Sequence, residues 1–203
     1  MRVTSFSTES NASNLYYISK DDRQCGVIVD PSLPPEFVFR RLGFRPKISE
    51  ILLTHGHYDH ILCLDEWRKE TGAPIAVGRY DAQYLQMPSL SLFSYFGENR
   101  TFEKAERLLD DGDLVSVGDE ALTVVTAPGH TPGSVLYRAE DFIIVGDVVF
   151  AGGGYGRVDF PLGDRDTLRA SLRKLFSFPD NPILYSGHGP SSYLRTEATY
   201  PHL

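Results

Sequence analysis

The segment Thr54-His-Gly-His-Tyr-Asp-His60 constrains this chain more than any other, because it holds three of its six histidines together with an aspartate. A short run rich in isoleucine and leucine precedes it and predicts a strand. Residues two apart in an extended segment point to the same side, so His55, His57 and Asp59 can reach one location. His60 would then reach a neighbouring one. Because imidazole is the commonest metal ligand in proteins, the segment predicts a metal site at the end of a strand.

Two more histidines and a second aspartate lie in short loops shaped by glycine or proline. His130 lies in Ala-Pro-Gly-His-Thr-Pro-Gly, His188 lies in Ser-Gly-His-Gly-Pro, and Asp147 follows a glycine at the end of an apolar run. Three or four ligands complete one tetrahedral zinc site. Seven candidates match two metals better, with the ions about 3.5–4 Å apart and sharing a carboxylate. The candidate ligands are His55, His57, Asp59, His60, His130, Asp147 and His188.

Composition narrows the class of partner. A chain of 203 residues with 41% hydrophobic residues suits one domain spanning 1–203. The net charge of −7 argues against a nucleic-acid partner, and no apolar run approaches the length of a membrane span. Two cysteines are too few for a disulfide scaffold, which favours a reducing compartment. We therefore expect a cytoplasmic protein with a small-molecule substrate; the oligomeric state stays open.

The hydrophobic pattern alternates short strands with helices in two similar halves. Strands are predicted at 3–6, 14–18, 26–30, 50–54, 75–77, 114–117, 121–126, 134–137, 141–145 and 183–185, and helices at 34–42, 61–70 and 164–177. Asp164 or Asp166 can cap the last helix. Residues 87–101 predict an irregular loop, either a lid over a site or a surface excursion. The order favours two sheets packed on each other with helices outside.

The order and spacing of these motifs resemble the metallo-β-lactamase-fold hydrolases across nearly the whole chain. The resemblance implies a four-layer αββα sandwich with the metals at one edge of the two sheets. It also implies two divalent cations, zinc first, with iron or manganese as alternatives. The implied ligand sets are His55, His57 and His130 for one ion and Asp59, His60 and His188 for the other, with Asp147 bridging.

Two further segments, Gly146-Asp-Val-Val-Phe150 and Gly156-Arg-Val-Asp-Phe-Pro161, are similar to the short glyoxalase II-like branch of that superfamily. This likeness implies hydrolysis of a thioester such as S-lactoylglutathione, or a related small acyl thioester, by a metal-bridging hydroxide. Asp59 and Asp147 would be the catalytic carboxylates. Tyr155 and Arg157 are candidate substrate contacts, although Arg157 can instead pair with Asp159.

The chain departs from that pattern at three places. It has Ile61-Leu-Cys-Leu64 where the family usually has glycines, and Gly189-Pro-Ser191 where glutathione enzymes have a tyrosine. Only about 15 residues follow His188, so we expect no helical C-terminal domain of the kind that helps full-length glyoxalase II to hold glutathione. Cys63 is expected to be a packed thiol rather than a ligand.

Other functions stay open at this point. An iron oxygenase resembling persulfide dioxygenase would use His55, His130 and Asp147. A lactonase or related esterase would use the whole ligand set on another carbonyl substrate. A non-catalytic metal-binding or interaction domain is a further alternative, but the presence of every ligand argues against it.

Overall fold

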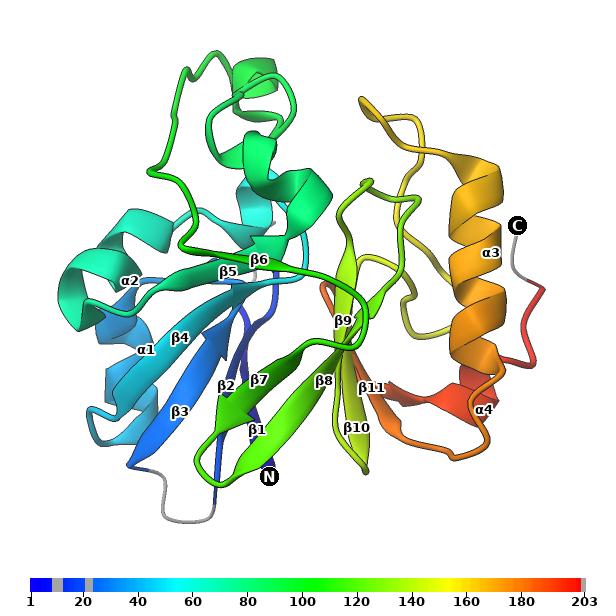
Figure 1. The fold of residues 1–203 in the computed structure, drawn as a ribbon, viewed down its shortest axis with the longest axis horizontal. Helices are drawn as coiled ribbons and strands as arrows, with labels where there is room; N and C mark the ends of the chain where they lie inside the picture. Colours follow the sequence, from blue (N-terminus) through cyan, green and yellow to red (C-terminus); the bar gives the residue numbers. More distant parts are fainter. Residues whose placement is uncertain (9–12, 21–23, 202–203) are drawn as a thin grey trace.

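The computed structural model describes residues 1–8, 13–20 and 24–201, which form two six-stranded sheets with helices outside them (Figure 1). The first sheet has the order β1 (Arg2–Phe6), β2 (Leu15–Ser19), β3 (Cys25–Val29), β4 (Lys47–Leu53), β5 (Ile75–Gly78), β6 (Arg107–Leu109). The second has the order β12 (Ser192–Tyr193), β11 (Ile183–Ser186), β10 (Phe142–Gly146), β9 (Val135–Arg138), β8 (Glu120–Thr126), β7 (Leu114–Val117).

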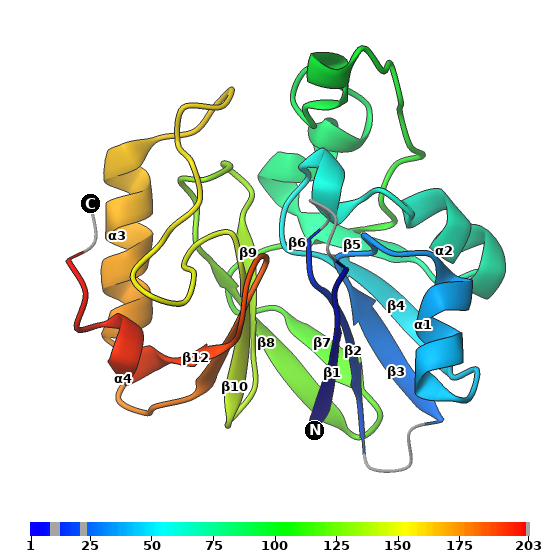
Figure 2. The same ribbon diagram turned by 180° about the vertical axis from the view of Figure 1, so that it is seen from behind.

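Helices cover the outer faces of both sheets, which gives four layers. Helices α1 (Pro35–Leu42) and α2 (Leu64–Thr71) lie against the first sheet, and α3 (Arg165–Phe176) lies against the second (Figure 2). Three apolar layers hold these four together, around Trp67 under α2, Tyr137 between the sheets and Leu172 under α3. The predicted αββα sandwich is therefore confirmed. No helix in the described part of the chain is long and apolar enough to cross a membrane.

The helices follow the periodicity and capping signals of the sequence. Helix α3 buries one face, which includes Leu168, Leu172 and Leu175. Of the two aspartates proposed as its cap, Asp164 accepts a hydrogen bond from Thr167 N at 2.7 Å. Helix α1 begins with proline, and Gly43 ends it with a φ of 79°, a conformation that glycine adopts without strain.

Several elements differ from the sequence prediction. Helix α2 begins at Leu64 rather than at residue 61, because a turn over residues 61–63 follows the short helix η1 (Tyr58–His60), and Ile61 packs into the core under the first sheet. Segment 87–101 contains the short helix η3 (Phe93–Phe96) instead of being wholly irregular. The strands β6 and β12 and the helix α4 (Leu194–Glu197) were not predicted, since two to four residues are too few to show a period.

The carboxyl ends of four strands place the candidate ligands at one edge of the sandwich. Strands β4, β8, β10 and β11 run into the loops that contain the seven side chains. Backbone hydrogen bonds join these loops: Val135 N donates to Thr54 O at 2.9 Å, and Gly187 N donates to Gly146 O at 2.8 Å. Two segments, 79–105 and 150–163, extend beyond the sheets on this side (Figure 1).

Replacing Asp164 with alanine should lower the free energy of unfolding by about 1 kcal/mol, because the cap of α3 is lost. Urea unfolding followed by circular dichroism measures the change. Asp166→Ala is the matched control, since Asp166 is exposed and pairs with Arg169 one turn later. Such a pair is worth only about 0.3–0.5 kcal/mol. Equal loss in the two variants would contradict a capping role for Asp164.

Candidate metal centre

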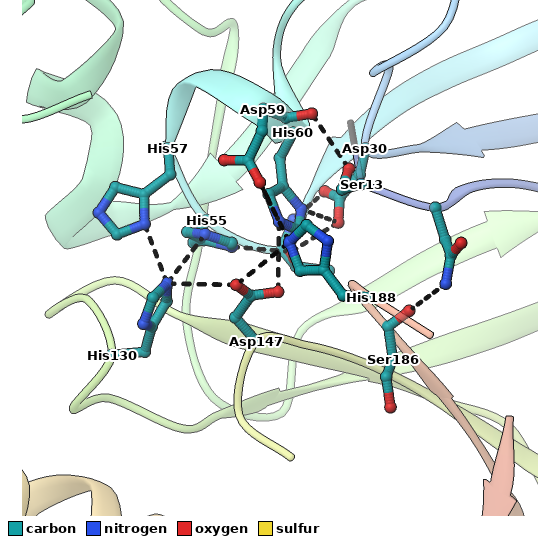
Figure 3. A network of polar contacts seen from close by, with 12 residues as sticks. Ser13, Asp30, His55, His57, Asp59, His60, His130, Asp147, Ser186 and His188 are labelled. Atoms are coloured by element: carbon teal, nitrogen blue, oxygen red, sulfur yellow. Dashed lines mark hydrogen bonds and ion pairs between the residues drawn. The ribbon is translucent and has the colours of Figure 1, made fainter. Parts of the chain in front are cut away.

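Seven side chains from four loops converge at the edge of the two sheets (Figure 3). The four imidazoles of His55, His57, His60 and His130 are at most 2% exposed. The carboxylates of Asp59 and Asp147 and the imidazole of His188 lie nearer the surface. The structure thus brings together every residue proposed as a ligand from the sequence.

Three histidines form the first group of possible ligands. Nε2 of His130 lies 2.9 Å from Nδ1 of His57 and 3.2 Å from Nε2 of His55. One acceptor nitrogen cannot make good hydrogen bonds to both others, because a ring nitrogen without a proton has a single lone pair. The Nδ1–H group of His130 donates a hydrogen bond to the carbonyl oxygen of Arg157, at 2.7 Å. Its Nε2 is therefore a lone-pair nitrogen facing two further ring nitrogens, an arrangement that suits a cation.

Asp59, His60 and His188 form a second group. Nε2 of His188 lies 3.0 Å from Oδ2 of Asp59, and Nε2 of His60 lies 3.8 Å from the same oxygen. Asp147 lies between the groups: Oδ1 is 3.2 Å from His60 Nε2, and Oδ2 is 3.6 Å from both His130 Nε2 and His188 Nε2. A single carboxylate thus reaches both sets of nitrogens.

The charges of these groups divide the site in two. Burial and then the neighbouring imidazoles lower the pKa of His55 and of His57 well below the ordinary value. Burial would also lower the pKa of His60, but Asp147, Asp30 and Asp59 hold it well above the ordinary value. Burial would raise the pKa of Asp147. The neighbouring imidazoles of His60, His130 and His188 instead hold it well below its usual range. One half offers neutral nitrogens and the other attracts positive charge.

The donor set fits divalent cations. His60 Nε2 and Asp147 Oδ1 are buried 3.2 Å apart, but they do not form a hydrogen bond of good geometry, and neither has another hydrogen-bond partner among the described residues. An unsatisfied buried polar atom costs about 1–3 kcal/mol, so two such atoms facing each other need another partner. Nitrogen and carboxylate ligands at this spacing suit zinc, iron or manganese.

Sequence reasoning missed Asp30, a carboxylate that orients the second group. Its side chain is fully buried and accepts hydrogen bonds from Thr54 N at 2.8 Å and Thr54 Oγ1 at 2.7 Å. Its Oδ2 also lies 2.8 Å from Nδ1 of His60. A carboxylate on the remote nitrogen fixes the ring orientation of a metal-binding histidine. Asp30 directly follows β3, and its place at a strand end is the signal that could have revealed it.

Asp81 plays the corresponding part beside the first group and was also missed. Its Oδ2 accepts hydrogen bonds from Gly56 N at 2.9 Å and Thr131 Oγ1 at 2.7 Å, and its Oδ1 accepts one from Gly133 N at 2.7 Å. Burial raises the pKa of Asp81 to about 6, although these hydrogen bonds oppose the rise. One carboxylate therefore joins the His55–His57 loop to the loop that contains His130.

Two glycines let the ligand loops approach closely. A Cβ atom on Gly187 would lie 2.0 Å from Oδ1 of Asp147, and one on Gly156 would lie 2.7 Å from Nδ1 of His130. Cys63 takes no part in the site: its Sγ donates weakly to Ser32 O at 3.6 Å, and burial raises the pKa of the thiol to about 12. This matches the packed thiol expected from the sequence.

A cavity of 290 Å³ opens beside the ligands. Asp59, Asp147 and His188 lie on its wall, and so do the proposed substrate contacts Tyr155 and Arg157. The guanidinium of Arg157 is paired with Asp159 through contacts of 2.8 and 2.7 Å, which is the structural alternative considered for this residue.

Asp81→Asn should weaken metal binding about 10- to 100-fold, the usual effect of changing a residue that orients metal ligands. The amide places an N–H₂ group against backbone N–H donors, so the two loops lose part of their connection. Competition with a chromophoric chelator measures the affinity. Asp110→Asn is the matched control, because Asp110 pairs with Arg79 at the surface. Equal affinities for the Asp81 variant and the wild type would show that Asp81 does not position the ligands.

Stripping the protein with a chelator should lower its melting temperature, because a bound metal stabilises only the folded state. A free metal concentration 100 times the dissociation constant contributes about 2.7 kcal/mol. Differential scanning calorimetry before stripping, after it, and after metal is restored measures the effect. Superimposable melting curves would count against metal binding at this site.

Comparison with known proteins agrees with this arrangement. The probable metallo-hydrolase YqgX of Bacillus subtilis is 35% identical over 91% of this chain and 89% of its own length. The hydroxyacylglutathione hydrolase GloC of Haemophilus influenzae is 30% identical over 92% of this chain and 88% of its own length.

Solved structures show the same fold. The BLEG-1 B3 metallo-β-lactamase aligns with a TM-score of 0.88 and 30% identity, over 98% of this chain and 97% of its own. TTHA1623, solved in a di-iron-bound form, aligns with a TM-score of 0.78 and 27% identity, over 98% of each chain. The model of the metallo-β-lactamase superfamily matches residues 10–188. The chain with this histidine and aspartate cluster therefore belongs to the metallo-β-lactamase superfamily.

Proposed function

We propose that this protein is a binuclear metallohydrolase of the glyoxalase II type, acting on S-lactoylglutathione or a related small acyl thioester. The observation that supports this most is the position of Asp147, which lies within 3.6 Å of ligand nitrogens in both groups and on the wall of a cavity. The likeness to the hydroxyacylglutathione hydrolase of Haemophilus influenzae supports the substrate class.

The ligand atoms divide between two cations. His55, His57 and His130 would hold one, Asp59, His60 and His188 would hold the other, and Asp147 would touch both. When bound, two divalent ions lower the pKa of a water molecule and polarise the acyl carbonyl group. We propose zinc, which accepts this nitrogen and oxygen set at four-coordinate sites; iron and manganese are the alternatives.

The side chains would then orient the attacking water, accept its proton and coordinate the cations. Asp59 faces the cavity, so its carboxylate can orient the attacking water and accept its proton. The leaving group is a thiol with an ordinary pKa of about 8.5, so it departs as a thiolate without a strong protein acid. The neutral rings of His55 and His57 keep their lone pairs for coordination.

The first alternative is a mononuclear iron oxygenase. Such a site would use His55, His130 and Asp147 and retain the other residues, so the presence of Asp59, His60 and His188 does not separate it from a binuclear hydrolase. A lactonase or esterase would use the same two groups on an oxygen ester. Metal content and a substrate panel separate these chemistries.

His57→Ala and Asp147→Ala should each lose metal and most thioester hydrolysis, because each removes a ligand that no neighbour replaces. Elemental analysis of protein purified without added metal, followed by an assay with S-lactoylglutathione on the same sample, tests this. Asp111→Ala serves as the control, since Asp111 pairs with Lys174 at the surface. Full turnover in either ligand variant would refute its assigned role, and iron without hydrolysis would favour the oxygenase.

A further inference from the structure

The cavity beside the candidate metal centre has apolar, mainly aromatic walls away from the ligands. Those walls are formed by Tyr58, Leu92, Phe150, Tyr155 and Phe160. The ring of Phe160 lies 5.5 Å from the ring of His57, so the apolar wall begins directly at a proposed ligand. Tyr95 extends the same surface outward, with its ring 6.5 Å from that of Phe160.

The charges on the cavity wall leave little to hold a substrate carboxylate. Among the described residues that line the cavity, Arg157 is the one lysine or arginine. Its Nε and Nη2 atoms contact Asp159 at 2.8 and 2.7 Å, and its guanidinium lies 4.4 Å from the centre of the Phe160 ring. The Nε–Nη2 edge of the guanidinium is therefore occupied, and the charge of Asp159 offsets that of Arg157. A substrate carboxylate would have to share the guanidinium with Asp159.

The remaining charged groups on the wall are carboxylates or proposed ligands. Asp59 and Asp147 face the proposed metal positions, where bound cations would offset their charge, and neither offers a donor group for the carboxylates of glutathione. The cavity volume of 290 Å³ lies just below the usual range for small-molecule sites, which is about 300–1,000 Å³. Its size and walls match a compact apolar group better than a charged chain.

We infer that this pocket selects acyl thioesters whose acyl group is apolar, aromatic above all, and whose thiol part is uncharged, in preference to thioesters of glutathione. This inference rests on the thioesterase activity proposed above. The aromatic acyl group would pack against Phe160 and Tyr58, with its carbonyl carbon beside Asp147. Phe160 is then the residue that determines specificity, and the Arg157–Asp159 pair, whose charges offset each other, offers a substrate carboxylate little attraction.

The reaction itself is ordinary hydrolysis. The water oxygen forms a bond to the acyl carbon, the carbon–sulfur bond breaks, and its electron pair stays on sulfur. One water proton passes through Asp59 to solvent, and the thiolate takes a proton from solvent. The products are a carboxylic acid and an uncharged thiol, and no oxidant or reductant is needed.

Four thioesters test the inference, combining lactoyl or phenylacetyl groups with glutathione or N-acetylcysteamine. With zinc-loaded wild-type protein, kcat/KM for phenylacetyl-N-acetylcysteamine should exceed that for S-lactoylglutathione at least about tenfold, a ratio equivalent to about 1.4 kcal/mol. Matching thioethers, which lack the carbonyl group, should show the same order of dissociation constants. Turnover that favours the glutathione thioesters would overturn this inference alone. No turnover of any of the four would overturn the proposed function as well.

Phe160→Ala should reduce the preference for the phenylacetyl group about tenfold, the ratio expected when most of an apolar contact worth about 1.4 kcal/mol is lost. The chain offers a matched control in Phe178, which also lies beneath an arginine, with the Arg138 guanidinium 4.0 Å from its ring centre. Phe178→Ala should leave the preference unchanged. An unchanged preference in the Phe160 variant, with its metal content intact, would contradict the assignment.

Asp159→Asn tests the charge argument without disturbing the aromatic wall. Releasing Arg157 should raise kcat/KM for the glutathione thioesters severalfold relative to the N-acetylcysteamine thioesters. Asp180→Asn is the matched control, because Asp180 pairs with Arg138 at 2.9 Å away from the cavity. A rise of equal size in both variants, or none in the Asp159 variant, would show that the pair does not disfavour carboxylates.

Discussion

The structure depends on a group of polar atoms that cannot satisfy one another. Nε2 of His130 faces two other ring nitrogens, and Nε2 of His60 faces a carboxylate oxygen of Asp147 without a good hydrogen bond. Burying such atoms is unfavourable unless they are paired. Divalent cations satisfy both sets at once, because they accept lone pairs from neutral imidazoles and balance the charge of carboxylates. The edge where the two sheets meet therefore suits bound cations, which satisfy both groups of ligand atoms.

Two buried aspartates make this arrangement rigid. Asp30 joins β3 to the start of the histidine loop and orients His60, while Asp81 joins that loop to the loop of His130. Each serves one group of ligands, and each receives hydrogen bonds from the backbone as well as from side chains. Because Thr54 and Thr131 contribute the hydroxyl groups, both threonines help to hold the loops together. The positions of the ligands follow from these contacts between loops rather than from the strands alone.

Local patterns explain which parts could be predicted. The histidine spacing after a strand identified four of the seven converging side chains, and the glycine- or proline-containing loops identified the other three. The periodicity of α3 together with its cap at Asp164 identified that helix. The start of α2 was placed too early, because the sequence does not show the turn over residues 61–63 that separates η1 from the helix. In the sequence, Asp81 resembles any other aspartate, and only its place at the end of a strand distinguishes Asp30. Their role arises only when distant loops meet, and a single sequence contains no record of that contact.

The walls of the cavity indicate a substrate preference that the proposed metal ligands do not. Thioester and ester hydrolysis would use the same metal chemistry on a carbonyl group. The substrate preference that we infer depends instead on Phe160 and the Arg157–Asp159 pair. The most direct test of the whole account is anomalous X-ray diffraction from crystals of protein purified without added metal. The account predicts two peaks about 3.5–4 Å apart, one among His55, His57 and His130 and the other beside Asp59 and His188. Clear electron density for the seven proposed ligand side chains, with no anomalous peak between them, would contradict it.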